Sequence, residues 1–446
     1  MRMWEGGIVR SSRYNVIEPY GDEFLVYNTA NGAFAALDAS VHAELLAGEG
    51  PHADQLAEAG FLTELLPAEE LDAICERFDA VRADRSKLEL SLVPTYVCNY
   101  RCPYCYEKGH NSIPGKMDAA MMDKIMGFVD DRYAAEPFKL LSVQWYGGDP
   151  SLALDVVGEL SDRLIAWCRE RGVAYKALML TNANVIDADA AALIARCRIT
   201  NVLLTIDGPE PVHNARRVAA NGSNSYEANI QAARLLREQG VEVSATMNVD
   251  KVSWPLYAEF RDKLLAEEGI ELGVGKLCDY GHFFGEAPFA PPDFDLFTHE
   301  EFFDARLELF ASEEHNAAEM REMLAPINRF CAGNLDNYFV IDLLGDVYNC
   351  DGWVGDRSHV RFNLHDDPLT WNLTDIVFDA TRDPKCSICE LLPVCYGSCY
   401  WERVCNDMPC HPFKTTIGGY LRIYRDCFDE TAAVTGGMAL LARPMR

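Results

Sequence analysis

Cysteine spacing constrains this chain more than any other feature of its sequence. The 446 residues contain 16 cysteines, and many of them lie in clusters. Three lie in the segment Cys98-Asn-Tyr-Arg-Cys102-Pro-Tyr-Cys105, and four lie between positions 386 and 399. Structural disulfides are rare in a reducing compartment, so clustered cysteines in a chain without an export signal indicate metal ligands or redox chemistry.

Charge and hydropathy predict a globular protein of the cytoplasm. Residues 1–10 contain no apolar stretch typical of a signal peptide, and no apolar run reaches the length of a membrane-spanning helix. Apolar residues make up 49% of the chain, which excludes a mainly disordered or fibrous protein. The 40 basic and 69 acidic residues give a net charge of -29, which argues against binding to nucleic acid or anionic membranes.

Three regions can be distinguished along the chain, at residues 1–86, 87–320 and 321–446. The middle region alternates expected strands with expected helices, which predicts an α/β fold with a parallel sheet. Six such units indicate a partial (β/α)6 TIM-like barrel, open rather than closed. The expected strands are residues 88–93, 140–146, 177–180, 202–206, 241–247 and 271–277, and the expected helices include residues 118–132, 187–197 and 226–239.

The two flanking regions have different patterns. Residues 23–28 and 32–37 read as a β-hairpin, and helical patterns follow at residues 40–47 and 67–85, so a small appended domain is expected. From about residue 320 the periodicity weakens while cysteines become dense. Such a region can be held together by metal coordination instead of a large core.

The chemically unusual residues follow the expected strands of the barrel. The three-cysteine segment follows the first strand, and Gly147-Gly148-Asp149-Pro150 follows the second. Asn182 follows the third strand and Asp207 the fourth. The carboxyl ends of parallel strands meet at one edge of a barrel, where active sites lie, so we expect these residues to form one site.

Three thiolates on one short loop suit an iron–sulfur cubane, because they can hold three irons and leave the fourth iron open to a non-protein ligand. Structural zinc normally takes four protein ligands, so Cys98, Cys102 and Cys105 alone fit zinc poorly. The segment resembles the cluster loop of the radical S-adenosylmethionine (radical SAM) enzymes. In that family the aromatic residue at Tyr104 would pack against the bound organic cofactor.

Further segments resemble the same family. Residues 145–150 are similar to its Gly-Gly-Glu-Pro segment, which holds the amino group of the cofactor's methionine. Gly147 and Gly148 would allow close backbone approach, and a carboxylate suits an ammonium group. Asp149 stands where glutamate is usual, and its shorter arm weakens the case for direct contact by that side chain.

Other polar residues at the strand ends fit the resemblance as well. Asn182, Asp207 and Arg217 would meet the ribose hydroxyls or the methionine carboxylate of the cofactor. Strand-end caps or turns explain such residues equally well at the local level.

The region from Cys331 to Cys427 resembles the SPASM domain, which binds two auxiliary [4Fe–4S] clusters. By itself the stretch 386–399 could also be a zinc ribbon. The resemblance implies that the first cluster, with only three cysteines, has an open iron or an unrecognised ligand. Cys410 is favoured over Cys405 and Cys427 as the last ligand of the second cluster. The implied ligands are Cys331, Cys350 and Cys399 for the first cluster and Cys386, Cys389, Cys395 and Cys410 for the second.

Two more resemblances bear on the substrate. Asp351 corresponds to a candidate catalytic base of the relatives that mature sulfatases, although a solvent-facing turn before Gly352 is an alternative. Residues 1–86 resemble a winged-helix-like precursor-recognition domain, which would bind the leader of a precursor peptide by strand addition. A purely structural cap is the alternative for that region.

Together these resemblances predict a radical SAM peptide maturase with S-adenosyl-L-methionine, three [4Fe–4S] clusters and a flavodoxin or ferredoxin as electron donor. A 5′-deoxyadenosyl radical would abstract hydrogen from a ribosomally made precursor peptide. The leading product is a cysteine thioether crosslink of the sactipeptide or ranthipeptide type. Alternatives are formylglycine formation, as in anaerobic sulfatase maturation, carbon–carbon or carbon–oxygen crosslinking, and a non-catalytic zinc-binding protein.

Overall fold

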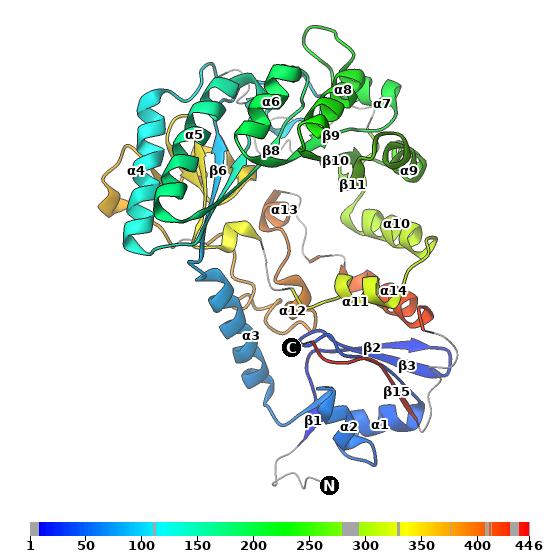
Figure 1. Ribbon diagram of the computed structural model, residues 1–446. Helices are drawn as coiled ribbons and strands as arrows, with labels where there is room; N and C mark the ends of the chain where they lie inside the picture. The colour runs from blue at the N-terminus through cyan, green and yellow to red at the C-terminus, as the bar shows by residue number, and fades with distance from the viewer. Residues whose placement is uncertain are drawn as a thin grey trace.

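A curved nine-stranded sheet with helices on its outer face dominates the computed structural model, and a smaller sheet lies at the opposite end (Figure 1). The structure describes residues 9–109, 113–278, 294–327, 331–374, 376–405, 410–411, 413–428 and 437–445. Within these ranges no helix is both long enough and apolar enough to cross a membrane.

Six parallel strands form the barrel part of the large sheet. They run in the order β11-β10-β9-β8-β7-β6, which is consecutive along the chain. The predicted partial barrel is therefore confirmed, and each predicted strand overlaps an observed one. The strands are β6 (Lys87–Val93), β7 (Leu140–Trp145), β8 (Ala174–Leu180), β9 (Ile199–Thr205), β10 (Glu242–Val249) and β11 (Glu271–Lys276).

The crossover helices cover the outer face of this sheet (Figure 1). Several of them begin where the sequence supplies a capping side chain. Asp118, Asp187 and Asn224 each accept a hydrogen bond from the backbone N–H three residues later, which satisfies a donor that the helix leaves unpaired. The helices are α4 (Ala119–Ala135), α5 (Leu154–Arg171), α6 (Ala188–Arg196), α7 (Glu210–Arg216), α8 (Ser225–Glu238) and α9 (Tyr257–Glu268).

The large sheet continues beyond β6 with three short strands from the C-terminal part of the chain. β12 (Tyr338–Asp342) pairs in parallel with β6, and β13 (Asp346–Tyr348) and β14 (Phe362–Asn363) follow in antiparallel order. The sequence pattern did not predict these strands. Their pairing places the segment after β13, which carries Cys350 and Asp351, beside the barrel.

The smaller sheet combines both ends of the chain, in the order β15-β4-β3-β2. The predicted hairpin is present as β3 (Glu23–Asn28) and β4 (Phe34–Leu37), while β2 (Asn15–Tyr20) and β15 (Met438–Ala442) were not predicted. Successive residues of the hairpin strands face opposite layers. One layer contains α1 (Ala39–Ala47) and α2 (Ala53–Glu58), and the other contains α14 (Phe413–Asp426).

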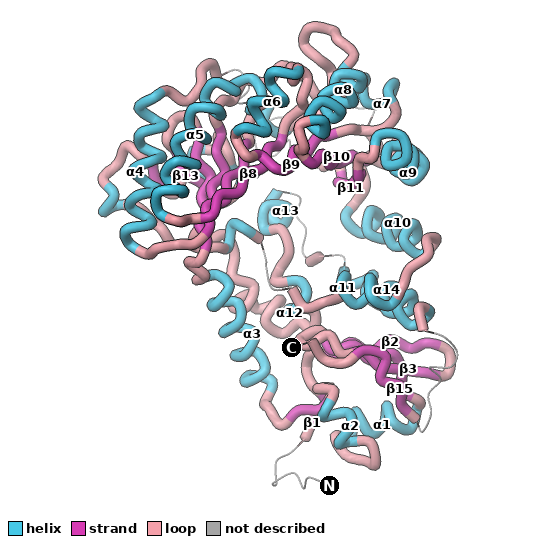
Figure 2. The backbone as a smooth tube through the Cα atoms, viewed as in Figure 1, coloured by secondary structure: helices cyan, strands magenta, loops and turns pink. Residues whose placement is uncertain are grey.

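Helices and loops connect the two sheets. The long helix α3 (Pro67–Arg82) runs between them, and Figure 2 shows that the segment around α12 and α13 consists largely of loop. The remaining elements are α10 (His299–Ala311), α11 (Ala317–Met323), α12 (Leu392–Cys395), α13 (Tyr400–Cys405) and the short strands β1 (Arg10–Ser11) and β5 (Leu62–Thr63).

Strand pairing crosses the two expected domain boundaries. β12 extends the barrel sheet across residue 320, and β15 joins the N-terminal sheet from the far end of the chain. The division into domains at residues 86 and 320 stays a prediction.

Candidate active site

A cavity of about 260 Å³ lies at the carboxyl ends of the barrel strands. All three cysteines of the predicted cluster loop line it, and so do most of the residues predicted to bind the cofactor. Segments that lie far apart in the sequence therefore meet at one place, as the strand-end argument predicts. The predicted residues in this lining are Cys98, Cys102, Tyr104, Cys105, Gly147, Gly148, Asn182 and Arg217.

Short polar contacts hold the cluster loop in shape. The backbone N–H of Cys105 donates to the carbonyl of Cys102 (3.2 Å), and that of Tyr100 donates to the Cys98 thiol (3.4 Å). The Asn182 side chain, from the end of β8, donates to Asn99 Oδ1 (2.7 Å) and contacts Cys98 Sγ (3.6 Å). Asn182 thus connects the loop to the third strand of the barrel.

Gly147 and Gly148 are needed for the approach of two backbone segments. Gly147 has a φ of +109°, in the region that favours glycine. A Cβ atom on Gly148 would lie 2.2 Å from the carbonyl oxygen of Tyr96. The structure shows that these glycines allow β7 to end against the start of the cluster loop, and their approach to a cofactor stays a prediction.

Asp149 connects the ends of two strands. Its Oδ1 accepts hydrogen bonds from Ser151 N (2.9 Å) and Thr181 Oγ1 (2.6 Å), and its Oδ2 accepts one from Asn182 N (3.1 Å). Burial raises the pKa of this carboxyl, while these hydrogen bonds act in the opposite direction. Asp149 is not among the residues that line the cavity, so its contact with the cofactor remains a prediction.

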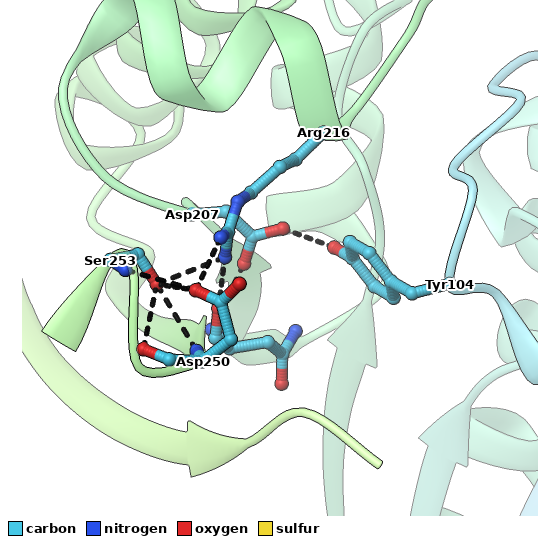
Figure 3. A network of polar contacts seen from close by, with 6 residues as sticks. Tyr104, Asp207, Arg216, Asp250 and Ser253 are labelled. Atoms are coloured by element: carbon cyan, nitrogen blue, oxygen red, sulfur yellow. Dashed lines mark hydrogen bonds and ion pairs between the residues drawn. The ribbon is translucent and has the colours of Figure 1, made fainter. Parts of the chain in front are cut away.

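Tyr104, Asp207 and Arg217 bond to one another. The Tyr104 hydroxyl donates to Asp207 Oδ2 (Figure 3), and Arg217 Nη1 donates to the Tyr104 oxygen at 2.9 Å. Asp207 Oδ1 accepts a hydrogen bond from the backbone N–H of Asn248 (2.9 Å). Burial raises the pKa of both Tyr104 and Asp207. Tyr104 and Arg217 line the cavity, whereas Asp207 lies behind Tyr104.

The sequence argument missed Glu107 as a residue of the cavity. Glu107 lies in a short 3-10 helix (Tyr106–Gly109), is 9% exposed and lines the cavity. Burial raises its pKa to about 7, and the charges of Asp351 and Asp149 act in the same direction. An acidic residue two positions after Cys105 was the available signal, but no periodicity marked it as buried.

Asp351 faces the interior of the barrel. It begins the 3-10 helix Asp351–Trp353, and its carboxylate accepts hydrogen bonds from three strands. The donors are Ser91 Oγ in β6 (2.6 Å), Gln144 Nε2 in β7 (3.1 Å) and Tyr338 Oη in β12 (2.8 Å). Burial raises the pKa of Asp351, and its charge in turn raises the pKa of Glu107. The carboxylate is therefore buried against three strands rather than in a solvent-facing turn, although it is not among the residues that line the cavity.

The remaining predicted ligands form two groups. Burial raises the pKa of Cys350, the charge of Asp351 raises it further, and Cys331 and Cys399 act in the same direction. A separate cavity of about 420 Å³ is lined by Cys386, Cys389, Cys395 and Cys410.

Of the two alternatives to Cys410, the structure describes the side chain of Cys427 but not that of Cys405. The thiol of Cys427 donates to the carbonyl oxygens of His315 (3.4 Å) and Ile423 (3.3 Å), and it is not among the residues that line this cavity. The side chain of Cys405 lies outside the described residues.

The cysteine loop at the barrel edge and the match to a known family agree. Residues 92–253 match the model of the radical SAM superfamily, a segment that begins at the end of β6 and contains the cluster loop. The chain therefore carries a radical SAM domain in this segment. A domain of this kind implies S-adenosylmethionine and an iron–sulfur cluster.

Curated relatives cover most of the chain at low identity. A cysteine-type anaerobic sulfatase-maturating enzyme of Clostridium perfringens (strain 13 / Type A) is 24% identical over 371 residues, which are 74% of this chain and 92% of the relative. A serine-type enzyme of Bacteroides thetaiotaomicron is 22% identical over 351 residues, which are 69% of this chain and 81% of the relative. The solved structure of native anSMEcpe with bound AdoMet and Cp18Cys peptide has a TM-score of 0.59 at 18% identity and covers 76% of this chain and 97% of its own. At this identity the structural likeness shows a shared fold.

The residues of the cavity fit the two cofactors. Cys98, Cys102 and Cys105 all line the cavity, and three thiolates suit a cluster with one open iron. Arg217 supplies a half-buried cation at the cavity, and its buried Nε has no hydrogen-bond partner among the described residues. A donor of this kind suits the carboxylate of an amino-acid group.

Proposed function

We propose that this enzyme modifies a ribosomally made precursor peptide, and that its leading product is an intrapeptide cysteine thioether crosslink. The observation that carries the choice of a substrate inside the barrel is the position of Asp351. Its carboxylate is held at the inner face of the barrel sheet by Ser91, Gln144 and Tyr338. A proton acceptor at that place suits a reaction on a substrate that enters the barrel.

The known relatives support a peptide as the substrate. The two relatives described above are sulfatase-maturating enzymes, and the solved structure with the same fold holds a peptide together with AdoMet. The peptide class of substrate is therefore the part of the proposal that the comparisons favour. The crosslink itself rests on the arrangement of the cysteines.

Each group of residues has a separate task in this proposal. Cys98, Cys102 and Cys105 would hold the catalytic cluster, and Arg217 and Asn182 would orient S-adenosylmethionine. When bound, these cofactors supply a radical that removes a hydrogen atom from an unactivated carbon. The protein orients the substrate and excludes water, and Asp351 accepts the proton of the substrate thiol.

Thioether formation also releases one electron, which needs an acceptor. The two further cysteine groups would hold auxiliary clusters that supply this redox chemistry. The first group is Cys331, Cys350 and Cys399, and its fourth iron would be open to a substrate thiolate. The second is Cys386, Cys389, Cys395 and Cys410. A flavodoxin or ferredoxin would reduce the catalytic cluster.

The N-terminal sheet would bind the leader of the precursor peptide. Strand addition needs an unpaired sheet edge, and β15 already occupies the edge of β4. In the described part of the small sheet, the outer strands are therefore β15 and β2. A leader strand would pair with one of these two.

Formylglycine formation is a second candidate. The names of the relatives and the buried position of Asp351 favour it. In that reaction a cysteine or serine side chain would be oxidised to an aldehyde, with Asp351 again accepting a proton.

Mass spectrometry of a co-expressed peptide separates these products. The enzyme would be produced together with any short open reading frame encoded beside its gene, and the peptide would be analysed by tandem fragmentation. A thioether loses two hydrogens, retains its sulfur and protects that cysteine from alkylation. Formylglycine from cysteine loses its sulfur and gains a carbonyl oxygen. A crosslink that persists after replacement of every peptide cysteine would exclude the thioether, and an unmodified peptide alongside cleaved cofactor would count against this substrate.

A further inference from the structure

We propose that Asp207 is a positioning residue for the catalytic centre, and that it acts through the hydroxyl of Tyr104 rather than by touching the cofactor. Tyr104 lies between Cys102 and Cys105, so its position is coupled to that of two predicted cluster ligands. Asp207 follows β9 on another side of the cavity. The proposal concerns the radical SAM site itself and does not depend on the peptide substrate.

The geometry gives Asp207 two partners. It is fully buried, and its two carboxylate oxygens are used separately. Oδ1 accepts from the backbone N–H of Asn248 at 2.9 Å, while Oδ2 accepts from the Tyr104 hydroxyl (Figure 3). One side chain therefore joins the cluster loop to the ends of β9 and β10.

The end of β10 is itself held firmly. Arg216 Nη1 donates to the carbonyl oxygen of Asn248 (3.1 Å) and to Ser253 Oγ (3.0 Å). Arg216 also forms a buried ion pair with Asp250, which accepts a hydrogen bond from Ser253 Oγ at 2.7 Å (Figure 3). The backbone of Asn248 is thus fixed at both its N–H and its C=O, and Asp207 has a rigid partner.

The Tyr104 hydroxyl stands between two opposite charges. Arg217 donates to its oxygen at 2.9 Å, and the hydroxyl donates in turn to Asp207. Buried charges require partners, because a charge left unpaired retains its full desolvation cost. Tyr104 therefore satisfies both groups and leaves Arg217 Nε without a protein partner among the described residues, available to a ligand in the cavity.

Counting donors shows why a carboxylate is needed at position 207. Two donors, Asn248 N–H and Tyr104 O–H, point at this side chain. A carboxylate offers two acceptor oxygens, whereas an asparagine of the same shape offers one oxygen and one NH2 donor. Asp207→Asn can therefore accept only one of these two donors, and where its amide N–H faces Tyr104 instead, the Tyr104 O–H loses its acceptor while the packing is preserved.

The test compares Asp207→Asn, Tyr104→Phe and the double variant. Iron and sulfide analysis reports cluster assembly, equilibrium dialysis gives the Kd for S-adenosylmethionine, and electron paramagnetic resonance records the reduced cluster with and without S-adenosylmethionine. We expect each single variant to retain its iron and to bind S-adenosylmethionine about tenfold more weakly, the effect of losing one hydrogen bond to a charged group. The spectral change on binding should differ from wild type in the same way for both.

The double variant decides between positioning and direct contact. If Asp207 acts through Tyr104, the double variant should bind no more weakly than Tyr104→Phe, because that variant already removes the bond to Asp207. Losses that multiply would show that Asp207 contacts the cofactor independently and would overturn the proposal. Wild-type affinity and spectrum for Tyr104→Phe would overturn it as well, even if Asp207→Asn fails to assemble a cluster.

Tyr100→Phe is the matched control. It removes a buried tyrosine hydroxyl from the same loop, and that hydroxyl bonds to Asn229 at 3.4 Å rather than to Asp207. Its affinity for S-adenosylmethionine should stay close to that of the wild type. A loss as large as that of Tyr104→Phe would assign the effect to general loosening of the loop and would count against the proposal.

Discussion

The indole N–H of Trp401 donates a hydrogen bond of 3.0 Å to the carbonyl oxygen of Gly352. This contact joins α13, which follows Cys399, to the turn that carries Cys350 and Asp351. The Trp401 ring also packs edge-on against Tyr106, next to Cys105. The Trp401 side chain thus contacts residues beside Cys350 and beside Cys105, and it belongs to the helix that follows Cys399.

Gly352→Ala should destabilise this contact. A Cβ at position 352 would lie 2.6 Å from Trp401 Nε1, so the indole must move. We expect a loss of about 1–3 kcal/mol in the free energy of unfolding, as for other overpacked sites, seen as a lower midpoint in anaerobic thermal unfolding. Gly127→Ala, in α4 with open space around it, is the control and should be neutral or stabilising. Equal midpoints for the two variants would contradict the contact.

Replacing Asp342 should change how stability depends on pH. Asp342 accepts hydrogen bonds from Tyr96 and Tyr348, and burial raises its pKa to about 6. The folded protein then holds this proton more tightly than the unfolded chain, so the stabilisation is present below pH 4 and is lost as the pH rises through 6. Between pH 5 and pH 7 the loss is about 1 kcal/mol.

Asp342→Asn should lack this loss. The difference in unfolding free energy between variant and wild type should therefore shift by about 1 kcal/mol in favour of the variant from pH 5 to pH 7. Denaturant titrations at the two pH values measure it. A constant difference would mean that Asp342 is ionised throughout this range.

His213 should produce the opposite trend. It is fully buried, its Nδ1 accepts from the backbone N–H of Asp207 (3.2 Å), and burial lowers its pKa to about 3. In the unfolded chain this histidine takes up a proton near pH 6.5, whereas in the folded protein it stays neutral. Its contribution to the free energy of unfolding is therefore present above that pH and is lost as the pH falls. His213→Asn keeps an acceptor without titrating. Between pH 7 and pH 5.5 we expect the wild type to lose about 1 kcal/mol relative to this variant, and parallel curves would contradict the assignment.

Iron analysis can distinguish Cys410 from Cys427 as a ligand. Cys410 lines a cavity with Cys386, Cys389 and Cys395, whereas Cys427 bonds to carbonyl groups elsewhere. If Cys410 is the ligand, Cys410→Ala should lose roughly four irons per chain, the content of one cubane. Cys427→Ala should retain its iron, and the reverse outcome would exchange their roles.

The sequence predicted the parts of the fold that have a local signal. Apolar strands and amphipathic helices of the barrel repeat with periods that can be read from neighbouring residues. The strands β12 and β14 lack this signal because they are short, and β15 is recognised as a strand only through its pairing with β4. Such pairings depend on residues that are distant in the sequence.

The residues of the candidate site also differ in how far the sequence alone predicts them. Spacing alone identified the cysteine loop, and the structure brings Asn182 and Arg217 to the same cavity. The orientation of Asp149 and Asp207 could not be predicted, because each carboxylate is committed to donors on other strands. Glu107 was missed because its burial results from the packing of several strand ends around the cluster loop.

The pairing of β15 with β4 has a consequence for how this protein can be made and divided. The first sheet to leave the ribosome lacks one of its four strands until residues 438–442 have been synthesised. Residues 1–86 expressed alone would expose the edge of β4 and the apolar residues that β15 covers, and exposed strand edges promote aggregation. The N-terminal region therefore depends on the last strand of the chain for a complete sheet. Transferring this region to another enzyme requires residues 438–442 to be transferred with it.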